Sequence, residues 1–249
     1  MYEYSALCLG LSFLAFLCIA WSPIAAILFW LLPEAWGRWL GRHAITAGFR
    51  LYLAVLSLIG ACRFDLAALD ALRGERSLII APNHPSLLDA VMILSRLPDL
   101  ACILKASLMD NILFGAGARL ARYIRNDTGH EMIKRARLDL LQGSHLLLFP
   151  EGTRTTRRPV NACKGSTGLI SRHAGTPVQT VIIETDSPFL GKHWPLFRRP
   201  ALPIRYRLRL GRRFDPPEDV RAFTAELERY FADELKAAYS QPLSVGRPG

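Results

Sequence analysis

A histidine and an aspartate five residues apart form the first pair in this sequence that could carry out acid–base chemistry. They stand in the segment Asn83-His84-Pro85-Ser86-Leu87-Leu88-Asp89, between an apolar run that predicts a buried strand and a run that predicts a helix. Open α/β sheets place their sites at such junctions. A neutral His84 whose ring donates to Asp89 keeps its other nitrogen free to take a proton. Taken alone, the spacing is frequent by chance and favours a capping histidine and a helix-start aspartate.

A second polar segment, Phe149-Pro150-Glu151-Gly152-Thr153-Arg154, follows another apolar run that predicts a strand. Gly152 permits close approach of a ligand to the backbone, and Arg154 can bind a phosphate through two nitrogens. Glu151 can accept a hydrogen bond from a hydroxyl group or hold a neighbouring arginine. Alone, this segment is equally compatible with a surface turn closed by an ion pair.

Together the two segments resemble the lysophospholipid acyltransferase family, of which 1-acylglycerol-3-phosphate acyltransferases are the best-known class. The family shows an NHxxxxD box, a K-x-x-L…G…R segment, FPEGTR, and an apolar strand that opens with proline. The matching residues are Asn83 to Asp89, Lys105-Ala106-Ser107-Leu108 with Gly115 and Arg125, Phe149 to Arg154, and Pro177-Val178. The resemblance covers roughly residues 75–185. The sequence departs from it at Ile112, where the family often has proline.

The resemblance implies transfer of a fatty acyl chain from a thioester to the hydroxyl of a lysophospholipid such as 1-acylglycerol-3-phosphate. His84 would be the general base, supported by Asp89, and amides at the start of the helix after Pro85 would stabilise the oxyanion. The donor would be acyl-CoA or acyl carrier protein, with no metal and no redox cofactor. The implied acceptor-binding residues are Lys105, Arg125, Glu151, Gly152, Thr153 and Arg154, and Pro177 would help to shape an acyl-chain groove. A specialised acceptor and a non-catalytic lipid-binding protein remain as alternatives.

The elements that must position these residues alternate between strands and helices after residue 62, which predicts an α/β domain over 63–240 with a mixed sheet flanked by helices. A period of two between Ile204 and Leu210 predicts a strand with one basic, solvated face. The tail, 241–249, is expected to be flexible. The predicted strands are 77–81, 101–104, 145–149, 177–184 and 204–210, and the predicted helices are 85–97, 129–142, 165–173 and 219–239.

The N-terminal region, 1–62, is expected to associate with a membrane. No charged residue occurs from Tyr4 to Pro33. A helix of that length would reach about 45 Å, against a hydrocarbon core about 30 Å thick. Pro23 lies inside this run; a tilted and kinked span fits, and so does a helix that breaks and returns. A second apolar run, 51–62, is too short to span alone; it is compatible with an interfacial helix, a helix packed on the first, or a core helix.

Basic residues and tryptophans beside the apolar run are typical of a membrane interface, with the basic side in the cytoplasm. They are Arg38, Arg42 and Arg50 with Trp30, Trp36 and Trp39. This pattern predicts attachment to the inner, cytoplasmic membrane with the catalytic domain on the cytoplasmic side. A cleaved signal is disfavoured, because the earliest charge is that of Glu3.

The composition of the chain limits the classes of molecule that it is expected to bind. The formal net charge is +10 and 51% of the residues are hydrophobic, which suggests nucleic acid, an anionic membrane or a phosphorylated substrate. Nucleic acid explains neither the apolar N-terminus nor FPEGTR, so membrane lipid and a phosphorylated substrate remain. The basic stretch 198–213 is interpreted as a solvated strand face or a lipid contact.

Five cysteines without a CxxC pair argue against a disulfide framework or zinc site. The GxSxG motif of serine hydrolases and the HExxH motif of zinc hydrolases are absent. The sequence leaves the oligomeric state open.

Overall fold

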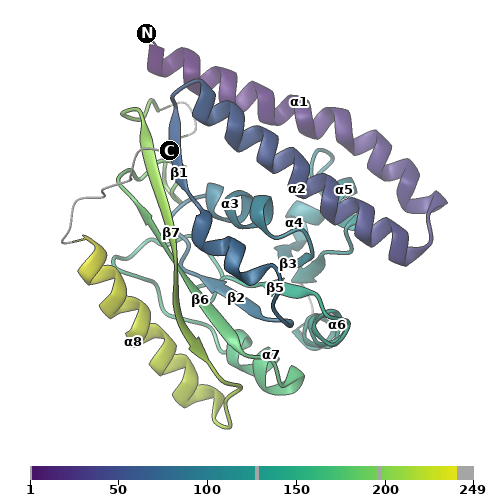
Figure 1. The fold of residues 1–249 in the computed structure, drawn as a ribbon, viewed down its shortest axis with the longest axis vertical. Helices are drawn as coiled ribbons and strands as arrows, with labels where there is room; N and C mark the ends of the chain where they lie inside the picture. Colours follow the sequence, from purple (N-terminus) through teal and green to yellow (C-terminus); the bar gives the residue numbers. More distant parts are fainter. Residues whose placement is uncertain (1, 127–128, 196–197, 240–249) are drawn as a thin grey trace.

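A mixed sheet of seven strands forms the centre of the molecule (Figure 1). The computed structural model describes residues 2–126, 129–195 and 198–239. The strand order is β1-β7-β6-β2-β5-β3-β4, and neighbouring strands are parallel except β6 and β7, which are antiparallel. The predicted fold class is therefore confirmed. The strands are β1 (Cys62–Asp65), β2 (Ile79–Pro82), β3 (Leu100–Lys105), β4 (Ile124–Asn126), β5 (His145–Leu147), β6 (Val178–Thr185) and β7 (Ile204–Phe214).

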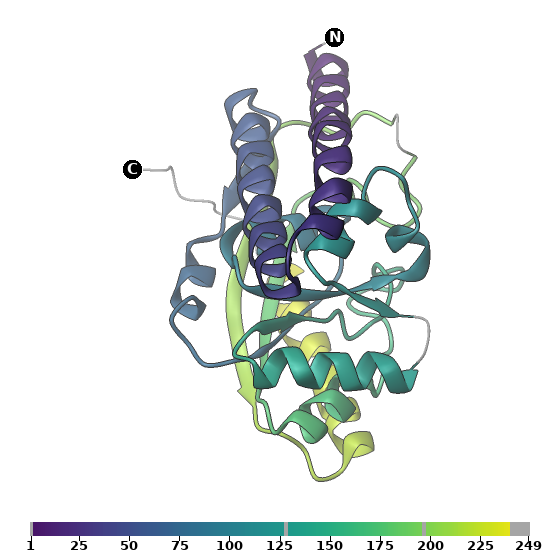
Figure 2. The ribbon, with the colours of Figure 1, turned by 90° about the vertical axis from the view of Figure 1, so that its right-hand side faces the viewer.

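Helices cover both faces of this sheet, so the apolar side chains form a core on each side (Figures 1 and 2). One core packs α1, α2 and α3 against the sheet, and the other packs α6, α7 and α8 against the opposite face. The helices are α1 (Tyr2–Leu31), α2 (Glu34–Leu58), the 3₁₀ helix η1 (Ala67–Leu72), α3 (Leu88–Arg96), α4 (Ala106–Met109), α5 (Gly115–Leu120), α6 (Gly129–Leu141), α7 (Ser166–Ala174) and α8 (Val220–Tyr239).

Helix α3 begins three residues later than the proline signal predicts. The first helical residue is Leu88 rather than Pro85. Two side chains explain the delay: the Ser86 N–H donates to Asp89 Oδ2 at 2.8 Å, and the Leu88 N–H donates to Ser86 Oγ at 3.3 Å. These bonds satisfy the leading amides in a turn before the helix starts. Asp89 consequently lies in the first turn of α3.

The N-terminal region forms a hairpin of two long helices that stand side by side in Figure 2. Helix α1 runs through Pro23 without interruption, and the chain turns back only after Leu31. Of the two alternatives, the helix that breaks and returns is the one observed, with the break after Leu31 rather than within the helix. The second apolar run belongs to α2, which begins at Glu34 and packs on α1, α3 and α5. Among the described residues, α1 alone is long and apolar enough to cross a membrane by length and composition.

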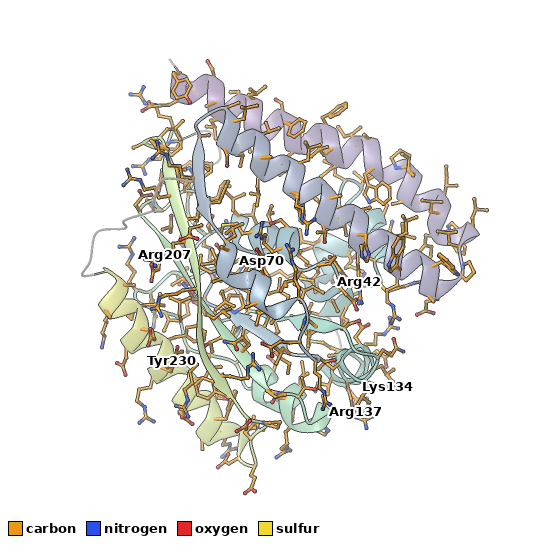
Figure 3. The ribbon with its side chains drawn as sticks, in the orientation of Figure 1. Arg42, Asp70, Lys134, Arg137, Arg207 and Tyr230 are labelled. Carbon is orange, nitrogen blue, oxygen red and sulfur yellow. The ribbon has the colours of Figure 1, made fainter. Side chains whose placement is uncertain are left out.

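The three arginines expected at a membrane interface lie against the α/β domain instead. Arg42 is 1% exposed and donates to Asp99 Oδ1 at 2.8 Å, to Asp139 Oδ1 at 3.0 Å, to Ser144 Oγ and to the Ala121 carbonyl. Figure 3 shows Arg42 on the domain side of α2. Arg38 bonds Gln142, and Arg50 donates to the Ser95 carbonyl. The positive charges of α2 therefore anchor the hairpin to the domain and give no information on membrane orientation.

The basic face of β7 is confirmed as a strand face, and most of its arginines are in ion pairs. Arg207, labelled on β7 in Figure 3, forms an ion pair with Asp65. The other pairs are Arg209 with Glu184 and Glu234, Arg212 with Glu226, and Arg213 with Glu75. This face therefore offers little unpaired charge to a lipid. The predicted flexible tail, 241–249, lies outside the described residues.

Candidate active site

The two predicted chemical segments meet at the carboxyl edge of the sheet. His84 follows the end of β2 by two residues, and the segment Phe149–Arg154 follows β5, the parallel neighbour of β2. Parallel strands end at the same edge, so the chain delivers both segments to one place. Thr155 N–H donates to the His84 carbonyl at 2.7 Å, which joins them directly.

His84 and Asp89 are in contact. The distance from His84 Nδ1 to Asp89 Oδ2 is 2.8 Å, and the aspartate side chain is fully buried while 15% of the histidine side chain is exposed. Because an ionised carboxylate only accepts, Nδ1 carries the proton of the neutral ring. Nε2 is then left with its lone pair, as a general base requires.

The His84 ring and backbone are held from several directions. The ring stacks on Phe149 with centroids 3.8 Å apart. The His84 N–H donates to Glu151 Oε1 at 2.9 Å, so the residue that precedes Pro85 is fixed on both its amide and its carbonyl. A base held in this way needs no rearrangement before it can act.

Asp89 is a buried carboxyl group whose pKa is raised above its ordinary value. Burial is the largest cause, and the hydrogen bonds from His84 and Ser86 act in the opposite direction. Both bonds are made to Oδ2. Oδ1 is buried and has no hydrogen-bond partner among the described residues. The site therefore keeps a poorly solvated carboxylate beside the imidazole, which is unfavourable for stability and useful for holding a ring that gains a proton.

Comparisons with known proteins cover the part of the chain that holds this site. A protein-family model described as Acyltransferase matches residues 63–184, which include β2, α3 and both chemical segments. Over these 122 of the 249 residues the chain is similar to the acyltransferase family. A crystal structure of the 1-acyl-sn-glycerophosphate (LPA) acyltransferase PlsC from Thermotoga maritima is similar over 98% of this chain and 100% of that chain, with a TM-score of 0.68 and 17% sequence identity. At that identity the match shows a shared fold. No match to a curated protein was found.

Glu151 of the acyltransferase FPEGTR segment is turned into the protein. It is 3% exposed. Its Oε1 accepts from the His84 amide, both oxygens accept from Thr155 Oγ1, and Oε2 accepts from the Asn161 amide. With its oxygens so engaged, the carboxylate positions the loop and the base. The direct acceptor contact expected of Glu151 from the sequence stays a prediction.

Gly152, Thr153 and Arg154 lie on the solvent side of the same loop. Gly152 has φ +66°, a conformation that favours glycine. Arg154 Nη1 donates to the carbonyls of Leu190 at 2.8 Å and Gly191 at 3.0 Å. Arg154 therefore ties the FPEGTR loop to the loop after β6, and both loops border His84. Thr153 is half-buried beside them.

Lys105 and Arg125 share the sheet edge with His84 but stand on more distant strands. Lys105 ends β3 and Arg125 lies in β4, two and three strands from β2. At about 4.8 Å a strand, these separations are about 10 and 14 Å. Arg125 Nη1 forms an ion pair with Asp110 at 2.6 Å. Both residues are at the correct edge, and neither touches the catalytic pair.

Pro177 is not brought to the site. It precedes β6, which runs parallel to β2 with Val178 opposite Ile79. Pro177 is therefore level with Leu78, just before the start of β2. Leu78 precedes His84 by six residues, which is about 20 Å along the strand. The carboxyl end of β6, rather than its beginning, reaches His84, and the expectation that Pro177 helps to shape an acyl-chain groove stays a prediction.

The amides at the start of α3 are also not available to an oxyanion. Pro85 has no N–H group, and the amides of Ser86, Leu88 and Asp89 bond within the turn. The Leu87 N–H donates to the Leu190 carbonyl at 3.1 Å. The expected oxyanion donors are thus occupied.

The sequence does not indicate the role of several residues that hold this edge of the sheet together. Asn83 Oδ1 accepts from the Ile183 amide at 2.7 Å and its Nδ2 donates to the Ile183 carbonyl, so a side chain continues the pairing of β2 with β6. Ser86 Oγ donates to the Phe189 carbonyl and lies 3.3 Å from the Tyr206 hydroxyl. Tyr206 could have been suspected, since it lies on the buried face of a predicted strand. No cluster of three His, Cys, Asp or Glu side chains able to hold a metal occurs in the described ranges.

Proposed function

We propose that this protein transfers a fatty acyl chain from acyl-CoA or acyl carrier protein to the free hydroxyl of a lysophospholipid, with 1-acylglycerol-3-phosphate as the acceptor. The observation that carries the proposal is the 2.8 Å contact between His84 Nδ1 and Asp89 Oδ2 inside an acyltransferase-family domain. The PlsC neighbour, described as an LPA acyltransferase, supports this choice of acceptor through the shared fold.

His84 acts in both halves of the proposed reaction. Nε2 removes the proton of the acceptor hydroxyl as its oxygen attacks the thioester carbon, which gives a tetrahedral oxyanion. When the C–S bond breaks, the leaving thiolate takes a proton from the imidazolium, so the ester and the free thiol form without a net change on the enzyme. Asp89 stabilises the imidazolium during this interval. General-base catalysis of this kind contributes about 10²–10⁴-fold.

The FPEGTR loop binds the phosphate-bearing acceptor in this proposal. Gly152 gives the phosphate access to the backbone, and Arg154 contributes its guanidinium while it holds the loop after β6. Lys105 and Arg125, further along the same edge, take the more distant part of the headgroup. Glu151 serves the acceptor indirectly, because it fixes the loop and the base.

The α1 face that points away from the domain supports a membrane contact. Among its exposed large apolar residues are Phe16, Ile19, Ile27 and Trp30, the last 85% exposed. An apolar surface of this length is typical of a membrane contact. We propose that α1 associates with the inner membrane and that the α/β domain faces the cytoplasm, where it meets a thioester donor.

The decisive experiment measures release of free thiol from acyl-CoA and from acyl carrier protein by the purified full chain, with and without 1-acylglycerol-3-phosphate. We expect release that depends on the acceptor, with diacylglycerol phosphate as the product. His84→Ala should lower kcat at least about 100-fold, whereas His173→Ala, at an exposed position of α7, should not.

Other outcomes would overturn the proposal in recognisable ways. Wild-type turnover by His84→Ala contradicts the role of the base. Lipid binding without thiol release for any acceptor indicates the non-catalytic alternative. Thiol release with an acceptor that lacks glycerol phosphate, and not with 1-acylglycerol-3-phosphate, indicates a specialised acyltransferase.

A further inference from the structure

Lys164 lies directly over the glycine of the FPEGTR loop. A Cβ placed on Gly152 would lie 2.7 Å from Lys164 Nζ and 2.7 Å from its Cε. The side chain therefore crosses the one position of the loop that has no side chain of its own. The backbone at this point is fixed, since the Lys164 amide donates to the Pro150 carbonyl at 2.8 Å and the Cys163 amide donates to Glu228.

The ammonium group of Lys164 has no hydrogen-bond or ion-pair partner within residues 2–126, 129–195 and 198–239. The nearest acidic residue in sequence is Glu151, whose carboxylate oxygens accept hydrogen bonds from His84, Thr155 and Asn161. Lys164 also stands two residues before the first residue of α7, whose N-cap Gly165 offers no side-chain cap. A cation beside a helix N-terminus is unfavourable unless an anion is present, so this corner of the molecule favours an anionic ligand.

The other basic groups near the loop are already engaged. Arg154 Nη1 binds two carbonyls of the loop after β6, and Arg125 is paired with Asp110 on the far side of β3. Lys164, by contrast, is exposed and unpaired beside Gly152, one residue from the Glu151 that holds the His84 amide.

We infer that Lys164 is an acceptor-binding residue and that its ammonium receives the phosphate monoester of the acceptor above Gly152. This inference rests on the proposed function and adds a residue that the sequence did not single out. It gives Gly152 a second purpose besides its positive φ: any side chain there would displace the lysine. Lys164 would hold the phosphate, with help from the Arg154 nitrogens other than Nη1, beside the loop that fixes His84.

The test compares two acceptors, 1-oleoylglycerol-3-phosphate and 1-oleoylglycerol, which differ only in the phosphate. Lys164→Gln should raise the KM for the phosphorylated acceptor about 10-fold, the loss of one charge-assisted hydrogen bond, with kcat nearly unchanged. Lys164→Arg keeps the charge and should stay within about 3-fold of wild type. Lys236→Gln, which removes an exposed lysine from the last turn of α8, should change neither constant.

A wild-type KM in Lys164→Gln overturns the assignment, and so does an equal rise for both acceptors, which would indicate a structural role. Equilibrium binding of 1-oleoylglycerol-3-phosphate in detergent, without a donor, separates this inference from the proposed function. Binding that weakens in Lys164→Gln, in a protein that transfers no acyl chain, would overturn the proposed function and keep the phosphate site. Transfer and binding that are both indifferent to Lys164 would overturn only the assignment of this lysine.

Discussion

At the scale of the residue, His84 is held by several contacts, whereas its partner Asp89 has a carboxylate oxygen without a hydrogen-bond partner among the described residues. Ring, amide and carbonyl of His84 are all engaged, yet Asp89 makes both of its described bonds through one oxygen. The raised pKa of Asp89 means that folding disfavours its ionised form. Function and stability therefore make opposite demands on this carboxyl group.

Substitution of Asp89→Asn should separate those demands. The amide keeps the shape and removes a buried charge, so the midpoint of thermal unfolding should stay the same or rise. The kcat for acyl transfer should fall about 10²–10⁴-fold, because an amide neither fixes the Nδ1–H tautomer nor stabilises the imidazolium. Thermal unfolding and steady-state kinetics on the same preparation check both parts. A variant that is both unfolded and inactive would contradict the view that the carboxylate is held at a cost.

The candidate site could be predicted in part because its chemistry lies in short segments. His84 and Asp89 are five residues apart, and the turn between them brings them together locally. Glu151 could not be placed, since a carboxylate in a turn gives no hint that it will bond an amide 67 residues away. Lys164 was missed for the same reason: its position over Gly152 depends on how residues 149–164 fold back.

At the scale of the element, the direction of each strand decides which of its two ends lies near His84. The runs that became β2, β5, β6 and β7 were recognisable from their apolar patterns, but a pattern does not state which end of a strand meets the site. The parallel pairing of β6 with β2 places Ile183 near His84 and Pro177 at the opposite edge of the sheet. Short elements such as β1, β4, α4 and α5 carry too few residues for a periodic signal.

The docking of α2 depends on a buried arginine. Arg42 is enclosed by Asp99, Asp139 and Ser144, and Asp139 is itself largely buried. Arg42→Met should lower the free energy of unfolding by about 3 kcal/mol, because it leaves Asp139 buried without its partner. Chemical denaturation in detergent measures this.

Arg135→Met provides the matched control, since Arg135 forms an exposed pair with Glu131 on α6. It should cost less than about 0.5 kcal/mol. Equal losses for the two variants would show that the Arg42 cluster has no special part in holding the hairpin.

At the scale of the whole molecule, stability should depend on His145. The ring is buried; Nδ1 accepts from the Leu78 amide at 3.1 Å, and Nε2 lies 3.0 Å from the Leu72 carbonyl. Nδ1 must stay unprotonated to accept, and burial lowers the pKa of His145 below 6.5. The unfolded chain therefore binds the proton more readily, so stability is complete above pH 6.5 and falls as the pH drops below it.

The free energy of unfolding, measured between pH 7.5 and 5, checks this dependence. The wild type should lose up to about 1.4 kcal/mol per pH unit from this group. In His145→Asn, whose Oδ1 can still accept from the Leu78 amide, the loss should be smaller, whereas the exposed His173→Asn should follow the wild type. Parallel curves for wild type and His145→Asn would exclude His145 as the source.

Membrane association should depend on the outward face of α1. Ile19 and Ile27 are both more than half exposed, and replacing both by glutamate should weaken binding to phospholipid vesicles at least about 10-fold, since each apolar side chain contributes about 1.5–3 kcal/mol when buried. Vesicle sedimentation measures this. Leu138→Glu, on α6, is the control, and an equal effect there would mean that α1 is not the contact.

The partners of Arg42 also constrain how the molecule is made. Ser144 follows Arg42 by 102 residues; at a synthesis rate of about 5–20 residues per second, the arginine emerges about 5–20 seconds before that partner exists. The hairpin therefore leaves the ribosome before the domain, as an apolar segment with an unsatisfied charge. The membrane contact proposed above can receive the apolar side of this hairpin while the arginine stays in water. On this view the nascent chain reaches the membrane first, and the catalytic domain folds there, beneath helices that are already in place.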